Sequence, residues 1–379
     1  MQTWTGIVPS PHTEPDAVVR FSHQGVEGWL VVDTVRDGLA FGGFRFSPSV
    51  TEAEVRSLAR AMTWKLAGHG MPTGGAKGGL CCDPKDPRIR DWISAFAQQC
   101  EGPLRTVAIV GKDMGATDDA IDHLYASLGI AQLELIRSRT HGDAFPKRIR
   151  DLAGYVPNMT GRGVAWATKA AVGNELAGRR VAIQGAGAVG IGSAVRLGEL
   201  GAKVVAISDA SGTIVARPGS VLPIEDLVRV ARAGILDRNA CRFLHDRASR
   251  DALLQADVDV LVLAASSHCV DDVLAGRIRA PIVTEGANFA LTEQARRVLA
   301  ARNVVVIPDV IASSSSAAMV THQLASGNAV APDELWANIE HTIARSVALG
   351  IANARRLGIT VREAYLQRFG IDCHEESHV

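Results

Sequence analysis

The chain has 379 residues, which at about 150 residues per domain predicts two or three domains. Its 40 Lys and Arg residues balance 40 Asp and Glu residues, so the formal net charge is zero. This balance argues against a nucleic-acid partner, which normally requires a basic excess. The apolar runs are shorter than the roughly 18 residues that a membrane span needs, so we expect no membrane partner either.

The first part of the chain mixes short strands with helices. Thr51 followed three residues later by Glu54 has the capping-box spacing that opens a helix, and an amphipathic stripe runs from Val55 to Leu66. Thr117 is expected to cap a second helix. Apolar runs predict strands at Gly28–Val35, Leu39–Phe46 and Arg105–Val110.

The second part alternates apolar strands with helices, which is typical of a parallel sheet covered on both faces. From about Pro332 onward the apolar spacing is helical. The fold class is therefore α/β, with two domains. The strands are expected at Arg180–Gln184, Lys203–Ser208, Val258–Ala264, Pro281–Glu285 and Asn303–Ile307.

A glycine-rich motif lies directly between a strand and a helix. It reads Gly185-Ala186-Gly187-Ala188-Val189-Gly190, which is G-x-G-x-x-G. In such a motif the first glycine permits the turn, the second lets the backbone approach a pyrophosphate, and the third lets helix and strand pack closely. The motif predicts a dinucleotide-binding domain, with a purely structural glycine turn as the alternative.

Asp209 ends the next expected strand, 24 residues (209 − 185) after the first glycine. An acid there would bond the ribose hydroxyls of NAD and repel the 2′-phosphate of NADP. Ser208, just before it, could tolerate the phosphate. We therefore expect NAD as the cofactor, with NADP possible.

Two lysines stand in unusual surroundings. Lys65 lies at the edge of the apolar stripe of its helix, so partial desolvation is expected, and it could hold a substrate carboxylate. Lys77 lies in Gly74-Gly75-Ala76-Lys77-Gly78-Gly79, which we interpret as a loop that approaches a small ligand. Burial would lower the pKa of Lys77 and let it act as a base or orient a water. The alternative is that both lysines are solvated.

The motifs together resemble the glutamate/leucine/phenylalanine/valine dehydrogenase family. The resemblance spans Gly42 to Ser316. It is carried by Gly42-Gly43-Phe44-Arg45, Met62-Thr63-Trp64-Lys65, the Gly74–Gly79 segment, Lys112-Asp113-Met114-Gly115-Ala116-Thr117, Thr160-Gly161-Arg162-Gly163-Val164 and Glu285-Gly286-Ala287-Asn288.

The resemblance implies NAD(P)-dependent oxidative deamination of an L-amino acid to its 2-oxo acid and ammonia, and the reverse reaction. It implies that Lys65 binds the α-carboxylate and that Lys77 polarises the attacking water. Asp113 would exchange protons with the amino group, while Thr160 and Asn288 would seat the nicotinamide. A lysine and a carboxylate in one site push their pKa values apart, which suits acid–base work.

The resemblance also implies a domain order and an assembly. We expect a substrate-binding, catalytic and oligomerisation domain at 1–155, a Rossmann domain at 156–334 and C-terminal helices at 335–379 that return to the first domain. The active site would lie in the cleft between domains. A homo-oligomer, commonly a hexamer or octamer, is implied. No metal site is expected, because the 11 histidines form no ligand-spaced pair in an expected helix.

The location is expected to be cytoplasmic. The N-terminus lacks a basic region followed by an apolar core, so no signal peptide is expected. The 6 cysteines form no C-x-x-C pair and are too sparse for a disulfide framework.

The prediction of the substrate side chain depends on two positions at which this chain departs from the glutamate-specific pattern. Those family members carry a lysine before the Gly-Gly-x-Arg strand and a serine in a later motif, where this chain has Phe41 and Val320. Gly42 and Gly43, which follow Phe41, are also expected at the substrate site. Apolar residues cannot pair a buried γ-carboxylate. We therefore predict an apolar or aromatic amino acid, with glutamate as the alternative.

A third departure concerns the family's Asn-Ala-Gly-Gly after Pro-Asp. Here Pro308-Asp309 is followed by Val-Ile-Ala and then Ser313–Ser316. Glycine permits a positive φ that serine takes less readily. This change leaves a catalytically lapsed NAD-binding protein as a further alternative.

Overall fold

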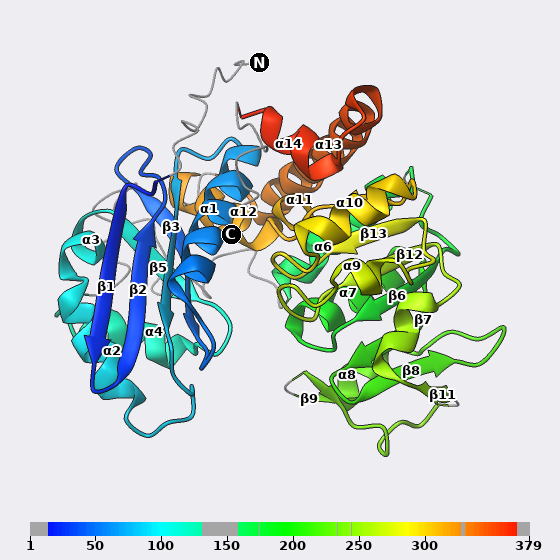
Figure 1. Cartoon of the computed structure of the whole chain (residues 1–379), viewed down its shortest axis with the longest axis horizontal. Helices are drawn as coiled ribbons and strands as arrows, with labels where there is room; N and C mark the ends of the chain where they lie inside the picture. Colours follow the sequence, from blue (N-terminus) through cyan, green and yellow to red (C-terminus); the bar gives the residue numbers. More distant parts are fainter. Residues whose placement is uncertain are drawn as a thin grey trace. The chain divides into compact units, whose positions relative to one another are not determined.

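The computed structural model describes residues 14–130, 158–173, 175–232, 234–243, 245–326 and 330–369. The N-terminal residues in which we looked for a signal peptide lie outside these ranges. The chain forms two compact units (Figure 1). Unit 1 contains Met1–Tyr155, Ala317–Trp336 and Phe369–Val379, and unit 2 contains Val156–Ser316 and Ala337–Arg368. Within the described ranges, no helix combines the length and the apolar character that crossing a bilayer requires.

Unit 1 is built on a five-stranded mixed sheet in the order β1-β2-β4-β3-β5. β3 pairs in parallel with both β4 and β5, while β2 pairs antiparallel with β1 and β4. The strands are β1 (Ala17–His23), β2 (Val26–Val32), β3 (Ala40–Phe46), β4 (Gly74–Leu80) and β5 (Ala108–Lys112). The helices are α1 (Glu52–Gly68), α2 (Ile89–Gln99), α3 (Glu101–Thr106), α4 (Asp118–Ala126) and α12 (Ser315–Ser326), whose last ten residues group with this unit.

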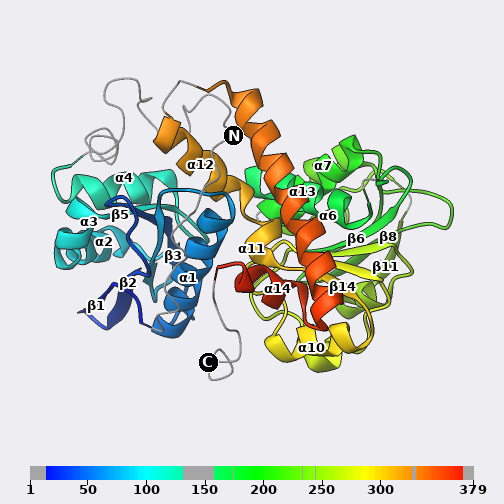
Figure 2. The ribbon, with the colours of Figure 1, turned by 90° about the horizontal axis from the view of Figure 1, so that it is seen from above.

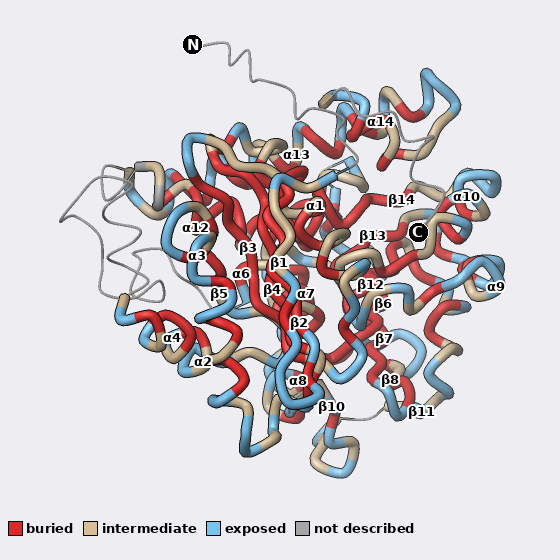
Figure 3. The backbone as a smooth tube through the Cα atoms, turned by 60° about the vertical axis from the view of Figure 1, so that its left-hand side comes forward, coloured by how far each residue is buried: buried red, intermediate tan, exposed pale blue. Residues whose placement is uncertain are grey.

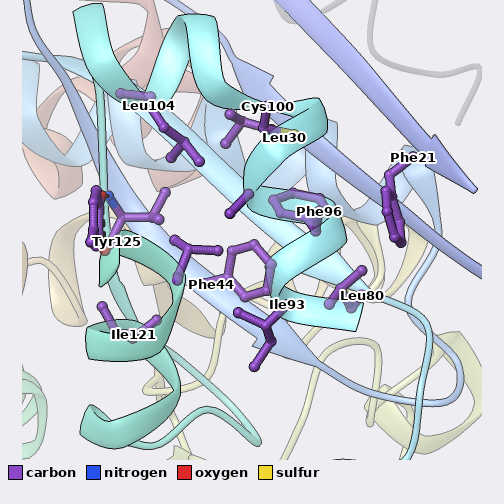
Figure 4. Packing of buried hydrophobic residues seen from close by; sticks show 14 of the residues in the cluster. Phe21, Leu30, Phe44, Leu80, Ile93, Phe96, Cys100, Leu104, Ile121 and Tyr125 are labelled. Atoms are coloured by element: carbon purple, nitrogen blue, oxygen red, sulfur yellow. Dashed lines mark hydrogen bonds between the residues drawn. The ribbon is translucent and has the colours of Figure 1, made fainter. Parts of the chain in front are cut away.

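The two faces of this sheet are covered by different helices, as Figure 2 shows. On one face, Phe44 packs edge-on against Phe96 of α2 in an apolar cluster that also takes in Leu104 and Tyr125 (Figure 4). On the other face, α1 contributes to a smaller cluster with β2. Because side chains alternate along a strand, each strand supplies core residues to the α2 face and other residues to the α1 face.

The Gly74–Gly79 segment is a strand, not the predicted loop. It lies between β2 and β3 in the sheet, and all its residues are buried. Its glycines follow from close packing: a Cβ at Gly75 would lie 2.3 Å from the backbone nitrogen of Thr63 in α1, and a Cβ at Gly78 would lie 2.2 Å from the Phe44 ring. Glycine is normally unfavourable in strands, so the sequence pattern alone favoured a loop.

Helix α1 begins as predicted, but its capping box is only half formed. The Thr51 side chain accepts a hydrogen bond from the Glu54 backbone nitrogen. The Glu54 carboxylate does not return to the cap; it pairs with Arg45 of β3. The helix start is therefore tied to the sheet through a charged contact that the local pattern did not reveal.

Unit 2 contains a seven-stranded sheet in the order β11-β8-β7-β6-β12-β13-β14. The five strands from β7 to β14 are parallel, as predicted, whereas β8 and β11 extend the sheet with antiparallel pairing that the sequence analysis missed. The strands are β6 (Arg180–Gln184), β7 (Lys203–Asp209), β8 (Gly212–Ala216), β11 (His245–Ala248), β12 (Val260–Leu263), β13 (Ile282–Glu285) and β14 (Val305–Ile307), with a separate hairpin of β9 (Ala231–Arg232) and β10 (Ile235–Leu236).

The central strands of this sheet are buried, as the tube in Figure 3 shows. Helices cover the sheet, which is the doubly wound arrangement of nucleotide-binding domains. The helices of this unit are α6 (Met159–Ala171), α7 (Ala188–Glu199), α8 (Ile224–Val230), η3 (Arg250–Gln255), α9 (Asp272–Ala275), α10 (Glu293–Ala301), α11 (Asp309–Ala312), α13 (Pro332–Leu357), which groups with this unit from Ala337 onward, and α14 (Val361–Gln367).

The compact units group the C-terminal segments differently from the predicted domains. Residues 337–368 belong to unit 2, although they were expected to return to the first domain. A buried ion pair joins α14 to α11 within this unit, since Arg362 donates to Asp309 at 2.7 Å. Residues 317–336, which were assigned to the Rossmann domain, group with unit 1 instead.

Candidate active site

A buried lysine and a half-buried carboxylate form an ion pair on the α1 face of the unit 1 sheet. The Lys77 Nζ atom on β4 is 2.9 Å from Asp113 Oδ2, just beyond the end of β5. Lys77 is 4% exposed. The structure thus brings together the two residues that the sequence analysis expected to act as an acid–base pair, and it excludes the alternative that Lys77 is solvated.

Gly43 makes room for this pair. It lies opposite Lys77 in the β3–β4 register and opposite Gly111 in the β3–β5 register. A Cβ atom at Gly43 would lie 2.9 Å from the Asp113 Cβ and 3.1 Å from the Lys77 Nζ. The neighbouring Gly42 faces the other way, where a Cβ would lie 1.6 Å from the Ala76 carbonyl oxygen. Both glycines are therefore required by close approach.

Two charged residues that we did not assign to the site extend the pair into a chain of alternating charge. The Arg45 Nε donates to Asp113 Oδ2 at 2.9 Å, and the Arg45 Nη1 donates to Glu54. Arg45 is only 5% exposed. The sequence held a signal for it, because an arginine in an otherwise apolar and glycine-rich strand is costly to bury without a partner.

This environment shifts both pKa values. Burial lowers the pKa of Lys77, and the charge of Asp113 partly opposes that shift. Burial acts to raise the pKa of Asp113, but the charges and hydrogen bonds of Lys77 and Arg45 outweigh it and hold this pKa well below its usual range. Asp113 is therefore a carboxylate at neutral pH, and Lys77 releases its proton more readily than a solvated lysine.

Lys65 is 5% exposed on α1, so its predicted desolvation is confirmed. A buried carboxylate holds this part of the helix against the sheet. Asp33, which follows β2, accepts hydrogen bonds from the Arg60 Nε at 2.6 Å and from the Thr63 Oγ1 at 2.5 Å. These two contacts hold the part of α1 just before Lys65 against the end of β2.

The two apolar residues expected at the substrate side chain are both buried. Phe41 is 7% exposed and Val320 is 6% exposed. Alternation along β3 places Phe41 on the same face as Gly43 and Arg45, which is the face that carries the Lys77 pair. Val320 lies on α12, which contacts the end of α1 through the rings of His322 and His69, 6.4 Å apart.

In unit 2, the three glycines of the G-x-G-x-x-G motif have the distinct environments that dinucleotide binding needs. Gly185 has a φ of +102°, and a Cβ there would lie 2.5 Å from the Ala264 carbonyl oxygen. A Cβ at Gly190 would lie 1.9 Å from the Gly185 carbonyl oxygen, so the helix and the turn are in direct contact. Only Gly187, the N-cap of α7, would meet no atom within 4 Å. That open space at a helix N-terminus fits a pyrophosphate.

Ala188 and Val189 are the other two residues of this motif that were predicted to bind the cofactor. Ala188 is exposed and Val189 is half-buried at the start of α7. A Cβ at Gly286, in the loop after β13, would lie 3.4 Å from a Val189 methyl group. The loop that carries Asn288 therefore packs against the glycine-rich motif.

Thr160 and Asn288 both lie half-buried in unit 2. Thr160 is in the first turn of α6, which packs on α7 so closely that a Cβ at Gly161 would lie 2.5 Å from the Gly192 carbonyl carbon. Beside Asn288, the Phe289 backbone nitrogen donates to Asp309 at 3.1 Å. Their roles at the nicotinamide stay predictions.

Asp209 ends β7, as predicted for the ribose-binding acid, but its carboxylate is already bound within the chain. It accepts hydrogen bonds from Arg238, the Leu236 backbone and Ser211. Burial acts to raise the pKa of Asp209, but these hydrogen bonds outweigh it and lower that pKa. The hydroxyl of Ser208 is buried and has no hydrogen-bond partner among the residues that the structure describes.

The four serines that replace the family's Asn-Ala-Gly-Gly adopt an ordinary backbone, since none of them has a positive φ. Ser313 and Ser314 donate to backbone carbonyls one turn earlier, at Asp309 and Ile311. Ser315 donates to the Met159 carbonyl of α6 at 2.8 Å. The serine hydroxyls therefore bind backbone carbonyls of α11 and α6 where α12 begins, and the backbone here does not need the conformational freedom of glycine.

A mixed substrate domain with a buried lysine paired to an aspartate, next in sequence to a dinucleotide-binding domain, defines an NAD(P)-dependent amino acid dehydrogenase. Two family models match the chain. The Glu/Leu/Phe/Val dehydrogenase dimerisation domain matches residues 17–128, and the Glutamate/Leucine/Phenylalanine/Valine dehydrogenase domain matches residues 155–364. The chain belongs to the glutamate/leucine/phenylalanine/valine dehydrogenase family.

Its relatives include glutamate dehydrogenases of archaea. It is 34% identical over 309 residues to the NADP(+)-dependent glutamate dehydrogenase of Pyrobaculum calidifontis, covering 79% of this chain and 72% of the relative. It is 33% identical over 297 residues to the glutamate dehydrogenase of Aeropyrum pernix, covering 77% and 70%. Among solved structures, the hetero-hexameric glutamate dehydrogenase of Thermus thermophilus in its Leu-bound form is similar with a TM-score of 0.77 at 26% identity, covering 96% of this chain and 91% of that one.

Proposed function

We propose that the chain oxidatively deaminates L-glutamate to its 2-oxo acid and ammonia, and carries out the reverse reductive amination. The support for glutamate is the set of relatives named for it, at up to 34% identity over most of this chain. The comparisons give no support to the apolar side chain that the sequence analysis favoured. The observation that carries the reaction class is the ion pair of the buried Lys77 with Asp113.

In this proposal the residues of unit 1 bind and handle protons. Lys65 binds the α-carboxylate of the substrate. Lys77, whose pKa burial lowers, orients and deprotonates the water that attacks the imino carbon. Asp113 exchanges a proton with the substrate nitrogen, and Arg45 holds the Asp113 carboxylate in place at 2.9 Å.

The residues of unit 2 bind the coenzyme. The open backbone at Gly187 receives the pyrophosphate, and Thr160 and Asn288 position the nicotinamide end. NAD or NADP supplies the hydride acceptor when bound. The chain's own contribution is therefore positioning, acid–base chemistry and the exclusion of water.

A second candidate substrate is an apolar L-amino acid, and one specific observation favours it. Phe41 and Val320 are both buried apolar residues, and Phe41 shares the sheet face of the Lys77 pair. A γ-carboxylate without a cation in such surroundings would be destabilised by several kcal/mol. Glutamate therefore requires donors that these two positions do not provide.

The two substrates are separated by kcat/KM for glutamate and for leucine, measured on the wild type and on Phe41→Lys. A higher kcat/KM for glutamate in the wild type supports glutamate, and the variant should then change this preference by less than about threefold. A wild type that prefers leucine, with at least about a tenfold shift towards glutamate in Phe41→Lys, would replace glutamate with the apolar substrate. Phe41→Leu keeps an apolar residue and is the matched control.

We also propose a homo-oligomer of the cytoplasm. The matched N-terminal family model is described as a dimerisation domain, and the Thermus thermophilus relative is described as hexameric. Light scattering on the full chain gives the mass of the assembly directly. A hexameric mass is expected, and a monomer would contradict this part of the proposal.

A further inference from the structure

We propose that Arg238 sets coenzyme choice by engaging Asp209, so that the site accepts a dinucleotide with a 2′-phosphate at least as well as one without it. Asp209 is then a structural acid rather than a ribose acceptor, which reverses the expectation from its sequence position. The inference rests on the proposed dinucleotide-binding function of unit 2.

The acceptor capacity of Asp209 is filled by the chain itself. Its Oδ1 accepts from the Ser211 backbone nitrogen at 2.8 Å, from the Ser211 hydroxyl at 2.8 Å and from the Arg238 Nη2 at 2.7 Å. Its Oδ2 accepts from the Leu236 backbone nitrogen at 2.7 Å and from the Arg238 Nη1 at 3.0 Å. A carboxylate offers about four lone-pair sites, so these five donors leave none for ribose hydroxyls.

The charge of Asp209 is neutralised by the same contact. Arg238 binds both carboxylate oxygens, which is the bidentate geometry of a strong charge-assisted pair. An unpaired acid at the end of this strand favours NAD by accepting from the ribose and by repelling a 2′-phosphate. A paired acid does neither, because the guanidinium already occupies both of its oxygens and neutralises its charge.

Arg238 is held at this position by more than Asp209. Its guanidinium also donates to the Leu236 carbonyl at 3.2 Å, the Gly212 carbonyl at 2.8 Å and the Ser211 hydroxyl. Its side chain is 14% exposed, so the group is packed yet reaches the surface.

The segment that carries Arg238 also contacts the glycine-rich motif. Gly234, in the turn between β9 and β10, forms an isolated antiparallel bridge with Ala186. A Cβ at Gly234 would lie 4.0 Å from the Gly187 Cα. The segment is thus fixed at two points, the glycine-rich motif and the end of β7, which are the two places that bind the pyrophosphate and the adenosine ribose in such domains.

Calorimetric titration with 2′,5′-ADP and 5′-AMP tests the inference on the full chain. These two nucleotides differ only in the 2′-phosphate and require no turnover. The variants are Arg238→Gln, Asp209→Asn and the double variant. Arg229→Gln is the matched control, since Arg229 precedes the same segment and binds Asp226 and the Ala240 carbonyl instead of Asp209.

The wild type is expected to bind 2′,5′-ADP at least as tightly as 5′-AMP. Arg238→Gln should shift the ratio of the two affinities towards 5′-AMP by about tenfold or more, because it restores an unpaired acid. In the Asp209→Asn background the same change should shift the ratio by less than about threefold. Arg229→Gln should leave the ratio unchanged.

Three results would overturn the inference. One is a wild type that binds 5′-AMP about tenfold more tightly than 2′,5′-ADP. Another is a folded Arg238→Gln variant with an unchanged ratio. The third, which is measurable even if Arg238→Gln does not fold, is a loss of about tenfold or more in 5′-AMP affinity in Asp209→Asn, because Asp209 would then bind the ribose. Failure of the wild type to bind either nucleotide would instead contradict the dinucleotide site itself.

Discussion

Replacement of Gly43 by alanine is predicted to damage catalysis more than stability. The added Cβ would lie 2.9 Å from the Asp113 Cβ, whereas carbon atoms pack best at about 3.5–4.0 Å. Asp113 would have to move by about 0.6–1 Å, and the Lys77 ammonium would be crowded as well. A misplacement of about 1 Å at reacting groups can cost about a hundredfold in rate.

The stability cost should be modest because two effects oppose each other. Overpacking costs about 1–3 kcal/mol, while replacing glycine with alanine recovers about 0.4–1 kcal/mol through the unfolded chain. We expect Gly43→Ala to lose about a hundredfold in kcat/KM and about 1–2 kcal/mol in free energy of unfolding.

Gly111→Ala is the matched control. Gly111 lies opposite Gly43 on β5, and a Cβ there would have its nearest neighbour at 3.9 Å, the Gly42 carbonyl oxygen. Steady-state kinetics and urea unfolding on both variants provide the comparison. A Gly43→Ala variant with a kcat/KM within about threefold of that of Gly111→Ala would refute the role given to this glycine.

Two further predictions concern charged groups. Asp113→Asn removes the carboxylate that opposes the lowering of the Lys77 pKa, so the pKa of Lys77 should fall further. The rise of the residual kcat/KM on the alkaline side should therefore move to lower pH. A pH–rate profile checks this, and a rise that moves to higher pH would contradict it. Arg296→Met should lower the free energy of unfolding by about 3 kcal/mol, because it removes the buried bidentate partner of Glu285 at 2.8 and 3.1 Å. The exposed neighbour Arg297 on α10 provides the control Arg297→Met in urea denaturation, which should change the stability by less than about 0.5 kcal/mol, and equal losses in both variants would refute the assignment.

Much of the fold followed from periodicity and glycine placement. The strand Arg180–Gln184 has the predicted bounds, and its motif has the three glycine environments that the sequence implied. The strand that carries Lys77 was missed because close packing against α1 and Phe44 requires its glycines. Both of these contacts come from parts of the chain that are distant in the sequence. Local propensity cannot report such packing.

The candidate site was predictable where chemistry depends on residue type and not where it depends on long-range pairing. Lys77 and Asp113 could be expected together. The Glu54 carboxylate, in contrast, pairs with Arg45, nine positions earlier, instead of the helix cap that the local pattern predicted. Asp209 shows the same limit. Its place at the end of β7 was predicted, whereas its partner Arg238 is 29 residues further along the chain.

The most direct test of the central claim is coenzyme reduction, followed by nicotinamide absorbance, with a panel of L-amino acids from alanine through leucine and phenylalanine to glutamate. NAD and NADP are compared at alkaline pH, and Lys77→Ala is the control. We predict turnover with at least one amino acid, greatest with glutamate, and its loss in Lys77→Ala. Binding of the coenzyme without turnover across the panel would contradict it and would favour a catalytically lapsed nucleotide-binding protein.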